Sequence, residues 1–263
     1  MQRVGIVVPT LGKRPDYLAQ CLESIKQAST GENKAYVVMV APKNFDSSAF
    51  IHYGLVNKFI EDPGTGLSVA INLGFSSMPV AVEYINWLGD DDLLAPNSLD
   101  ITTLFLDNNK DTVLVFGGCN YIDPSGKVIW SNKSGQFTVP LLRFGPNLIP
   151  QPGALFRRVS FEKIGGLEAS LDWAFDFDLF IKLSKVGKLS FLKKQLSSFR
   201  WHPGSLSVEY RKKSVSEASR VRVSHLPAVV KPLSFIWEKP VQYATLVAGT
   251  RITSKSKKKA PEN

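Results

Sequence analysis

The chain has 263 residues, of which 44% are hydrophobic and 21% are charged, the proportions of an ordinary globular protein. This length allows one large α/β domain, or a domain with an appendage. No stretch approaches the roughly 18 apolar residues that span a bilayer. The amino end leads directly into Val4–Val8 with no signal-peptide pattern. The sequence therefore predicts a globular protein that does not cross a membrane.

Cysteine usage and charge narrow the class of protein further. Cys21 and Cys119 lie in apolar contexts without CxxC spacing, which predicts buried, reduced thiols and a cytoplasmic location. The net charge of +9 gathers partly near the carboxyl end, which suits anionic lipid or phosphorylated substrates. Nucleic acid is not the expected partner. Residues 251–263 are predicted to form a basic, disordered tail.

Strands and helices alternate over the first half of the chain. Helical spacing of apolar residues predicts helices at 16–27, 67–75 and 97–106. Short apolar runs predict strands at 4–9, 35–40, 58–61, 83–88 and 112–116. This alternation predicts βαβ units, a mostly parallel sheet and right-handed crossovers.

Beyond about residue 117 this pattern changes. Two short strands are expected around the Pro-Ser-Gly turn within 120–130, and another near 153–158. Helices are expected at 161–166 and 176–186. From 227 the chain becomes apolar and rich in proline, and it packs either on the domain or against something else. We expect a main domain over 1–208, a helical, proline-punctuated appendage over 209–250, and the tail over 251–263.

Three consecutive carboxylates, Asp90-Asp91-Asp92, directly follow the apolar run Tyr84–Gly89. Adjacent like charges at a strand end repel one another, and their ionised forms are costly without a cation. Mg²⁺ and Mn²⁺ prefer such oxygen ligands, and open α/β sheets bind ligands at this edge. The alternative is a solvated acidic turn, or Asp92 capping the helix that begins near Pro96.

Six ordered segments resemble the family-2 glycosyltransferases. They are Val7–Arg14, Gly64–Gly74, Trp87–Leu94, Ile149–Arg158, Asp172–Phe180 and Phe199–Ser207. The resemblance runs from Val4 to about Ser207. It implies an α/β GT-A fold with a Rossmann-like sheet. It also implies an inverting enzyme of the hexosyltransferase type, which moves a sugar from a nucleotide-diphosphate donor to an acceptor hydroxyl.

The resemblance also implies roles for individual residues. Asp176 would be the general base, with a helix-terminus interaction as the alternative. Mn²⁺ or Mg²⁺ would be held by Asp90, Asp91, Asp92 and His202, although a lone His in a Pro-Gly loop can be a plain surface residue. The implied acceptor contacts are Gln151, Trp173 and Asp178. The implied donor contacts are Pro9, Thr10, Leu11, Arg14, Leu67, Asn72, Asp90, Asp91 and Arg200.

The chain departs from the family pattern at several positions. Ala41-Pro42-Lys43-Asn44 stands where acidic residues usually help to bind the nucleobase, so the base is open and uridine is favoured. Ile71 replaces a frequent Arg, and Phe175 replaces a usual Glu at the catalytic helix. His52 and His225 are read as structural or exposed.

Two other classes of protein are also compatible with the sequence. A sugar nucleotidyltransferase would need a glycine-rich phosphate loop, whereas residues 9–14 contain one glycine. A non-catalytic protein that binds nucleotide-sugars or an anionic surface is a further alternative. For an enzyme, the expected acceptor is a polysaccharide, glycolipid or surface glycan. The basic carboxyl end could then contact the anionic inner membrane face.

Overall fold

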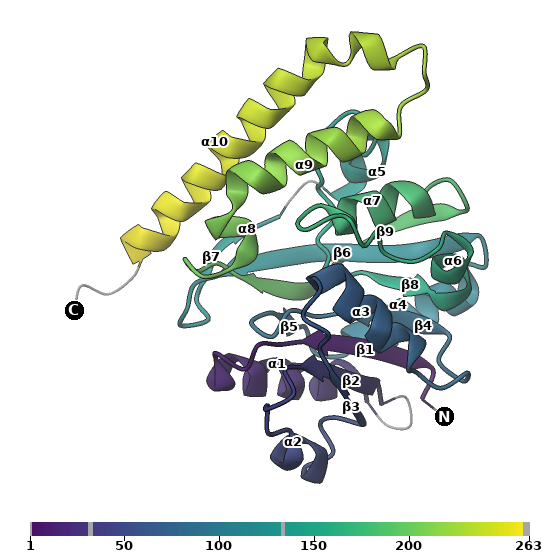
Figure 1. Cartoon of the computed structure of the whole chain (residues 1–263), viewed down its shortest axis with the longest axis vertical. Coiled ribbons are helices and arrows are strands. Elements are labelled where there is room, and N and C mark those ends of the chain that lie inside the picture. The colour runs from purple at the N-terminus through teal and green to yellow at the C-terminus, as the bar shows by residue number, and fades with distance from the viewer. Residues whose placement is uncertain (1, 31–33, 133–134, 260–263) are drawn as a thin grey trace.

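The computed structural model describes residues 2–30, 34–132 and 135–259. Within them, one nine-stranded sheet has the order β3-β2-β1-β4-β8-β6-β9-β5, and β7 pairs with β6 (Figure 1). The first four strands are parallel. They are β1 (Val4–Pro9), β2 (Tyr36–Ala41), β3 (Lys58–Glu61) and β4 (Tyr84–Trp87). The predicted α/β architecture with a mostly parallel sheet is confirmed.

Strands β1, β2 and β4 are largely buried because helices cover both faces of the sheet, whereas β3 at the edge is partly exposed. Side chains alternate between faces along a strand, so Val7 joins one hydrophobic core while Ile6 and Val8 join the other. The helices of this half are α1 (Pro15–Ala28), α2 (Ser48–His52), α3 (Leu67–Ser76) and α4 (Ser98–Asn108). Of these, the short α2 was not predicted. Cys21 and Cys119 are buried and free, as predicted.

The second half of the sheet is mixed. Its strands are β5 (Leu93–Leu94), β6 (Thr112–Ile122), β7 (Val128–Ser131), β8 (Leu155–Arg157) and β9 (Lys188–Arg200). The turn between β6 and β7 confirms the predicted hairpin. The long strand β9 was not predicted, because exposed Lys193, Lys194 and Gln195 interrupt its apolar pattern. It nevertheless runs parallel to β6 from Thr112 to Ile122, with register shifts that absorb this interruption.

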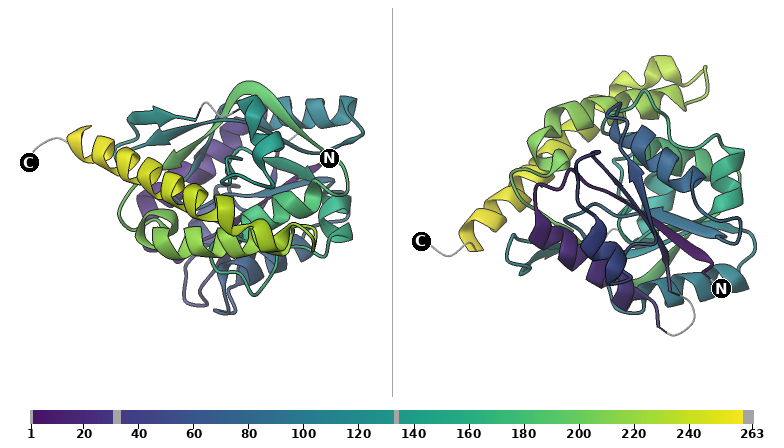
Figure 2. Two further views of the ribbon diagram at one scale, coloured as in Figure 1. Left: turned by 90° about the horizontal axis from the view of Figure 1, so that it is seen from above. Right: turned by 60° about the horizontal axis from the view of Figure 1, so that its bottom comes forward.

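The remaining helices lie mainly on one side of the sheet (Figures 1 and 2). They are η1 (Gly135–Phe137), α5 (Thr138–Leu141), α6 (Arg158–Lys163), α7 (Phe175–Leu183), α8 (Leu206–Glu209), α9 (Arg211–Ser224), η2 (Lys231–Leu233) and α10 (Phe235–Lys259). Helix α9 packs on α7, and α10 runs back along α9. None of the helices within the described residues is both long enough and apolar enough to cross a membrane.

Helix α10 extends into the region predicted as a disordered tail. The helix continues through residues 251–259, and Pro240 does not end it. Its last turns are held by Thr253, whose hydroxyl oxygen accepts hydrogen bonds from Trp201 Nε1 at 3.2 Å and Arg211 Nη2 at 2.8 Å. These tertiary contacts order a segment that composition alone marks as solvated. Residues 260–263 lie outside the described residues.

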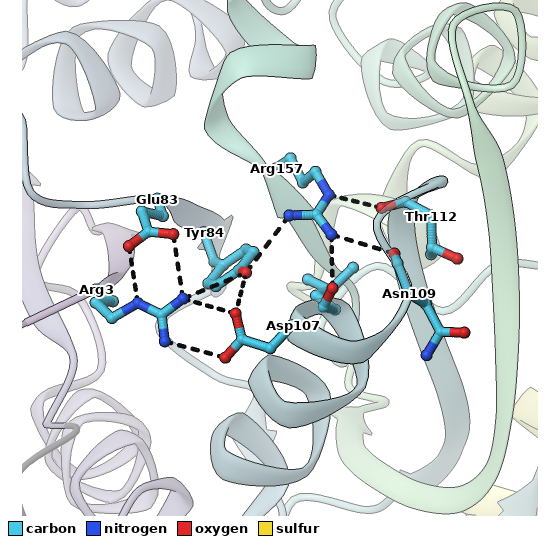
Figure 3. A network of polar contacts seen from close by, with 8 residues as sticks. Arg3, Glu83, Tyr84, Asp107, Asn109, Thr112 and Arg157 are labelled. Carbon is cyan, nitrogen blue, oxygen red and sulfur yellow. Dashed lines mark hydrogen bonds and ion pairs between the residues drawn. The ribbon is translucent and has the colours of Figure 1, made fainter.

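A polar network fixes the edge of the sheet where β1 and β4 begin (Figure 3). Arg3 pairs with Glu83 at 2.8 Å and Asp107 at 2.7 Å, and the Tyr84 hydroxyl donates to Asp107 at 2.6 Å. The hydrogen bonds from Arg3 lower the pKa of Asp107 to about 2. The guanidinium of Arg157 donates to carbonyl oxygens at the end of α4. These contacts hold together the end of the sheet where β1 and β4 begin. The acidic triplet lies at the opposite end, where β4 ends.

Candidate active site

The acidic triplet forms the turn between β4 and β5. The backbone N–H of Asp92 donates to the Gly89 carbonyl at 3.0 Å, which closes the turn. The Asp92 side chain is buried, and its Oδ1 accepts the backbone N–H of Arg200 at 3.0 Å. Burial, together with the charge of Asp91, raises the pKa of Asp92 well above its ordinary value. A buried carboxyl of this kind is stable as an anion only where positive charge is brought to it.

Asp90 connects the triplet to the loop that follows β1. The Thr10 hydroxyl donates a short hydrogen bond to Asp90 Oδ2, and the Gly12 N–H donates to the Thr10 hydroxyl at 2.9 Å. Burial raises the pKa of Asp90, and the bond from Thr10 opposes that rise only in part. The carboxyl ends of β1 and β4 therefore form one continuous polar edge.

Asp91 lies against the loop that follows β9. His202 Nε2 and Asp91 Oδ2 are 2.7 Å apart, and the His202 ring is buried beside the ring of Tyr17 at 5.8 Å. Arg14 donates to the Gly204 carbonyl at 3.2 Å, which ties the loop after β1 to the same loop. Leu11 extends outward with 59% of its surface exposed. The structure thus brings Thr10, Arg14 and the acidic turn to one place.

Arg200 is buried and braces the acidic turn, and its contact with a diphosphate stays a prediction. Only 1% of it is exposed, and its guanidinium stacks over Tyr17 at 4.3 Å. It donates to the Asp91 carbonyl at 3.0 Å, to the Pro124 carbonyl at 3.0 Å and to Gln20 at 2.8 Å. Because the N–H groups of the guanidinium are engaged in these hydrogen bonds, the buried Arg200 side chain holds the acidic turn in position.

The donor atoms at this edge fit a hard divalent cation that is completed by its substrate. Within the described part of the chain, no three His, Cys, Asp or Glu side chains form a ready-made metal cluster. Mg²⁺ and Mn²⁺ commonly use one or two carboxylates and take their remaining ligands from phosphate and water. Asp90 and Asp91 are two adjacent carboxylates of the kind such an ion uses, and His202 lies 2.7 Å from Asp91.

A cavity of about 330 Å³ extends from the acidic turn to α7. Asp92 and Asp176 both line it, although they are 84 positions apart in the sequence. The predicted Leu67, Gln151 and Trp173 also line the cavity. Helices α9 and α10 contribute further lining residues, namely Ser214, Val215, Ala218, Arg222, Gln242 and Thr245. The region beyond residue 208 therefore forms part of the cavity wall.

Asp176 begins α7 and faces this cavity. Its Oδ2 accepts a hydrogen bond from Asn147 Nδ2 at 2.9 Å, and its Oδ1 accepts the Phe177 N–H at 2.7 Å. Burial raises the pKa of Asp176 from 3.8 to about 6, against the opposing effect of these hydrogen bonds. A carboxylate with a pKa near neutral is suited to accept a proton from a hydroxyl group.

Glu217 was missed by the sequence analysis, although it organises the approach to α7. Its buried carboxylate on α9 accepts the backbone N–H groups of Trp173 at 2.7 Å and Ala174 at 2.8 Å. The negative charge of Glu217 also contributes to the raised pKa of Asp176. One feature of the sequence could have indicated this role, because Glu217 is the single acidic residue between Tyr210 and Trp237.

Asp178 is not among the residues that line the cavity, and its acceptor role stays a prediction. Asp178 follows Asp176 by two residues in α7. Its carboxylate lies 2.7 Å from His225 Nε2 and 2.7 Å from Lys182 Nζ. These partners lower its pKa even though burial alone would raise it. Asp178 and His225 therefore join α7 to the end of α9, so the structural reading of His225 fits this arrangement.

Asn72 and Gln151 act on the backbone. Asn72 donates to the Leu167 carbonyl at 2.9 Å and accepts the Leu167 N–H at 3.0 Å, so its amide clamps the loop after α6. Its contact with the nucleotide-sugar stays a prediction. Gln151 donates to the Trp87 carbonyl at 2.7 Å and to Asn86 at 3.0 Å. It braces the last residues of β4 while still lining the cavity.

Comparison with known proteins places this chain in a family. The sequence profile described as glycosyl transferase family 2 matches residues 5–165, more than half of the chain. The chain belongs to the family-2 glycosyltransferases, and the resemblance found in its sequence is confirmed. The match ends before Asp176, so the candidate base and helices α9 and α10 lie outside it.

Relatives with this family name are longer than the present chain. An uncharacterized glycosyltransferase of Rickettsia felis is 28% identical over 214 residues, which are 76% of this chain and 34% of that protein. One of Rickettsia typhi is 27% identical over 207 residues, 76% of this chain and 64% of that protein. The chain thus spans about a third of the first relative and somewhat under two thirds of the second.

Solved structures share the fold. The mannosyltransferase PcManGT from Pyrobaculum calidifontis, in complex with GDP-Man and Mn²⁺, superposes with a TM-score of 0.65 at 18% identity, covering 95% of this chain and 75% of that one. TarS of S. aureus, residues 1–349 with UDP-GlcNAc, gives 0.63 at 15% identity, covering 88% and 69%. At this identity the similarity establishes the GT-A fold alone.

Proposed function

We propose that this protein is a metal-dependent, inverting glycosyltransferase that moves a sugar from a nucleotide-diphosphate donor to an acceptor hydroxyl. One observation carries the proposal: a single cavity joins the acidic turn, through Asp92, to Asp176. The reaction needs positive charge at the leaving diphosphate and, separately, a proton acceptor at the attacking hydroxyl. Asp92, in the acidic turn, and Asp176, in α7, line this same cavity, and the two carboxylate sites to which they belong would supply these two needs.

Asp176 is the proposed general base. With a pKa of about 6 it is mostly ionised at neutral pH, yet it is basic enough to take the acceptor proton as attack proceeds. Asn147 holds one of its oxygens, which fixes the carboxylate toward the cavity. Attack from the face opposite the leaving group inverts the anomeric centre.

Asp91, His202 and Asp90 are the proposed metal ligands. These residues would hold a Mn²⁺ or Mg²⁺ ion, which would supply positive charge at the leaving diphosphate. Asp92 is a weaker candidate for direct ligation, because its Oδ1 already accepts the Arg200 N–H. The chain itself supplies the orientation: Thr10 holds Asp90, and Arg200 supports the turn at the Asp91 carbonyl.

The proposed donor site is the loop after β1, where Pro9, Thr10, Leu11 and Arg14 adjoin the acidic turn. PcManGT with GDP-Man and TarS with UDP-GlcNAc are neighbours whose nucleotide bases differ, so both bases are candidates, and uridine is tested first. The proposed acceptor is a polysaccharide, glycolipid or surface glycan assembled in the cytoplasm. Trp173 and Gln151 line its side of the cavity.

A panel of nucleotide-sugars tests the proposal. UDP- and GDP-sugars are added with Mn²⁺, and the melting temperature is followed, because a ligand that binds only the folded state raises it. The stabilising donor is then incubated with glycan acceptors, and the anomeric configuration of the product is read by NMR. A product that retains the donor configuration would overturn the inverting mechanism. Pyrophosphate release from a nucleoside triphosphate and a sugar phosphate would favour a nucleotidyltransferase instead.

A further inference from the structure

An exposed apolar surface lies where α9 turns back into α10. We call it the turn surface. Its members are Val229, Leu233, Phe235, Ile236 and Tyr243, which are 84%, 52%, 70%, 60% and 72% exposed. Residues 236, 240 and 243 share one face of a helix by their spacing, and Pro240 is exposed between the two apolar side chains. Large apolar side chains gathered in this way mark an interaction site more often than single exposed ones do.

The charges of the turn surface are all positive. Lys231 and Lys239 are exposed among its apolar residues. The single acidic residue between 226 and 250 is Glu238, and it is buried in an ion pair with Arg222 at 2.7 Å. The exposed side of this segment therefore combines apolar groups with cations and presents no carboxylate.

The opposite side of the same segment is anchored to the protein. Glu238 binds Arg222 and also accepts the Ser219 hydroxyl at 2.6 Å, while Trp237 packs edge-on against Phe144 at 5.7 Å. The turn surface is thus held on a fixed support. It forms the upper edge of the molecule in Figure 1, on the side away from α1 and α2.

We propose that the turn surface docks this protein on an anionic lipid bilayer. Aromatic and aliphatic side chains enter the boundary between headgroups and acyl chains, and lysines beside them bind anionic headgroups. Burial of apolar area and electrostatic attraction add in such contacts, and the turn surface offers both. This surface differs from the basic end of α10, which lies up to 24 residues beyond Phe235 along the helix, or about 36 Å.

Docking also gives the cavity a defined position, a consequence that rests on the proposed function. Gln242 and Thr245 line the cavity from α10, whereas Tyr243 between them is exposed on the outside. The thickness of one helix, about 10 Å, separates the two sides. A bilayer on the turn surface would therefore lie close to the cavity, as an acceptor anchored in that bilayer requires.

Flotation of the full-length protein with lipid vesicles tests the docking, without nucleotide, metal or acceptor. Vesicles of phosphatidylcholine are compared with vesicles that also contain phosphatidylglycerol. We expect binding to the anionic vesicles that weakens as salt is raised. Phe235→Ser with Ile236→Ser should lower the vesicle affinity by about tenfold or more. Lys231→Gln with Lys239→Gln should lower it by about 30-fold, or roughly fivefold for each lysine.

A matched control removes exposed apolar side chains from elsewhere. Val80→Ser with Leu104→Ser alters residues that are 95% and 63% exposed and far from α10 in sequence, and it should bind vesicles as the parent chain does. Circular dichroism confirms that each variant is folded. Equal vesicle binding by the Phe235/Ile236 variant and the parent overturns the proposal. So does absence of binding by the parent, or a parent dimer that this variant dissociates, since the surface would then bind a second copy. Because no transfer is measured, failure here leaves the proposed function untouched.

Discussion

The carboxylate of Glu217 on α9 accepts a 2.7 Å hydrogen bond from the backbone N–H of Trp173, three residues before Asp176. A second bond from Ala174 uses the next N–H group at the start of α7. An anion at a helix amino terminus is stabilised by these unpaired N–H groups, and charge-assisted hydrogen bonds are the stronger kind. Through these two hydrogen bonds, Glu217 links α9 to the start of α7, where the candidate base Asp176 lies.

Glu217→Gln tests whether this link sets the protonation of Asp176. Glutamine can keep a hydrogen bond, but it removes a negative charge that helps to raise the pKa of Asp176. The pKa should fall, so the acidic limb of the pH profile of kcat should move to lower pH. The folded state should also lose about 1–3 kcal/mol of stability. The exposed Glu209→Gln serves as the control. A lower kcat with an unmoved acidic limb would assign Glu217 a structural role alone.

Asp176→Asn should abolish transfer while leaving the donor bound. Removal of a general base typically costs 10² to 10⁴ in rate, and the loop after β1, the proposed donor site, is separate from α7. The decisive comparison is kcat against the dissociation constant of the donor, measured by calorimetry. Near-parental turnover by this variant would remove Asp176 from the base role.

The same variant should be more stable than the parent at high pH. The folded state raises the pKa of Asp176 from 3.8 to about 6, so it binds more protons than the unfolded chain between these values. Parental stability therefore falls as pH rises through that window. Asparagine lacks this cost, which is on the order of 3 kcal/mol above pH 6. Urea denaturation at pH 8 should show the gain, and at pH 4 the gain should be nearly absent.

Asp91→Asn should weaken Mn²⁺ binding in the presence of UDP by about 10- to 100-fold. Removing a residue that only supports a metal ligand already lowers metal affinity by this factor, and loss of a ligand should lower it at least as much. Calorimetry reads this without turnover. His202→Ala should act in the same direction, because its ring lies 2.7 Å from Asp91. Asp111→Asn, on an exposed carboxylate, is the control. Full transfer activity in EDTA would count against any metal at this edge.

Glu238→Ala should destabilise the fold by about 3–5 kcal/mol, because it leaves the buried Arg222 without its partner. Adding Arg222→Met should recover much of this loss, since a buried ion pair can be replaced by apolar groups at little cost. Denaturant unfolding of both single variants and the double variant gives the coupling between the two residues. Additive losses would mean that the ion pair does not hold α10 on α9.

The sequence by itself determined the parallel half of the sheet and the acidic turn. Uninterrupted apolar runs such as Val4–Pro9 fit only strands buried on both faces, and a local pattern is enough to find them. The triplet Asp90–Asp92 stands out for a similar reason, because three adjacent carboxylates after a buried strand are a local pattern. Its link to Thr10 follows from the rule that parallel strands end at one edge.

Tertiary structure alone decided which side chains face the cavity and which are braces. Arg200 and Asp178 look like site residues in the sequence, yet their partners come from segments far away along the chain, and those partners bury them. Glu217 looks like an ordinary helix residue until α9 packs on α7 and gives it three backbone residues to hold. The physical reason is that the free energy of a buried charge depends on the groups around it. Those groups come from distant segments, and no local sequence pattern encodes such contacts.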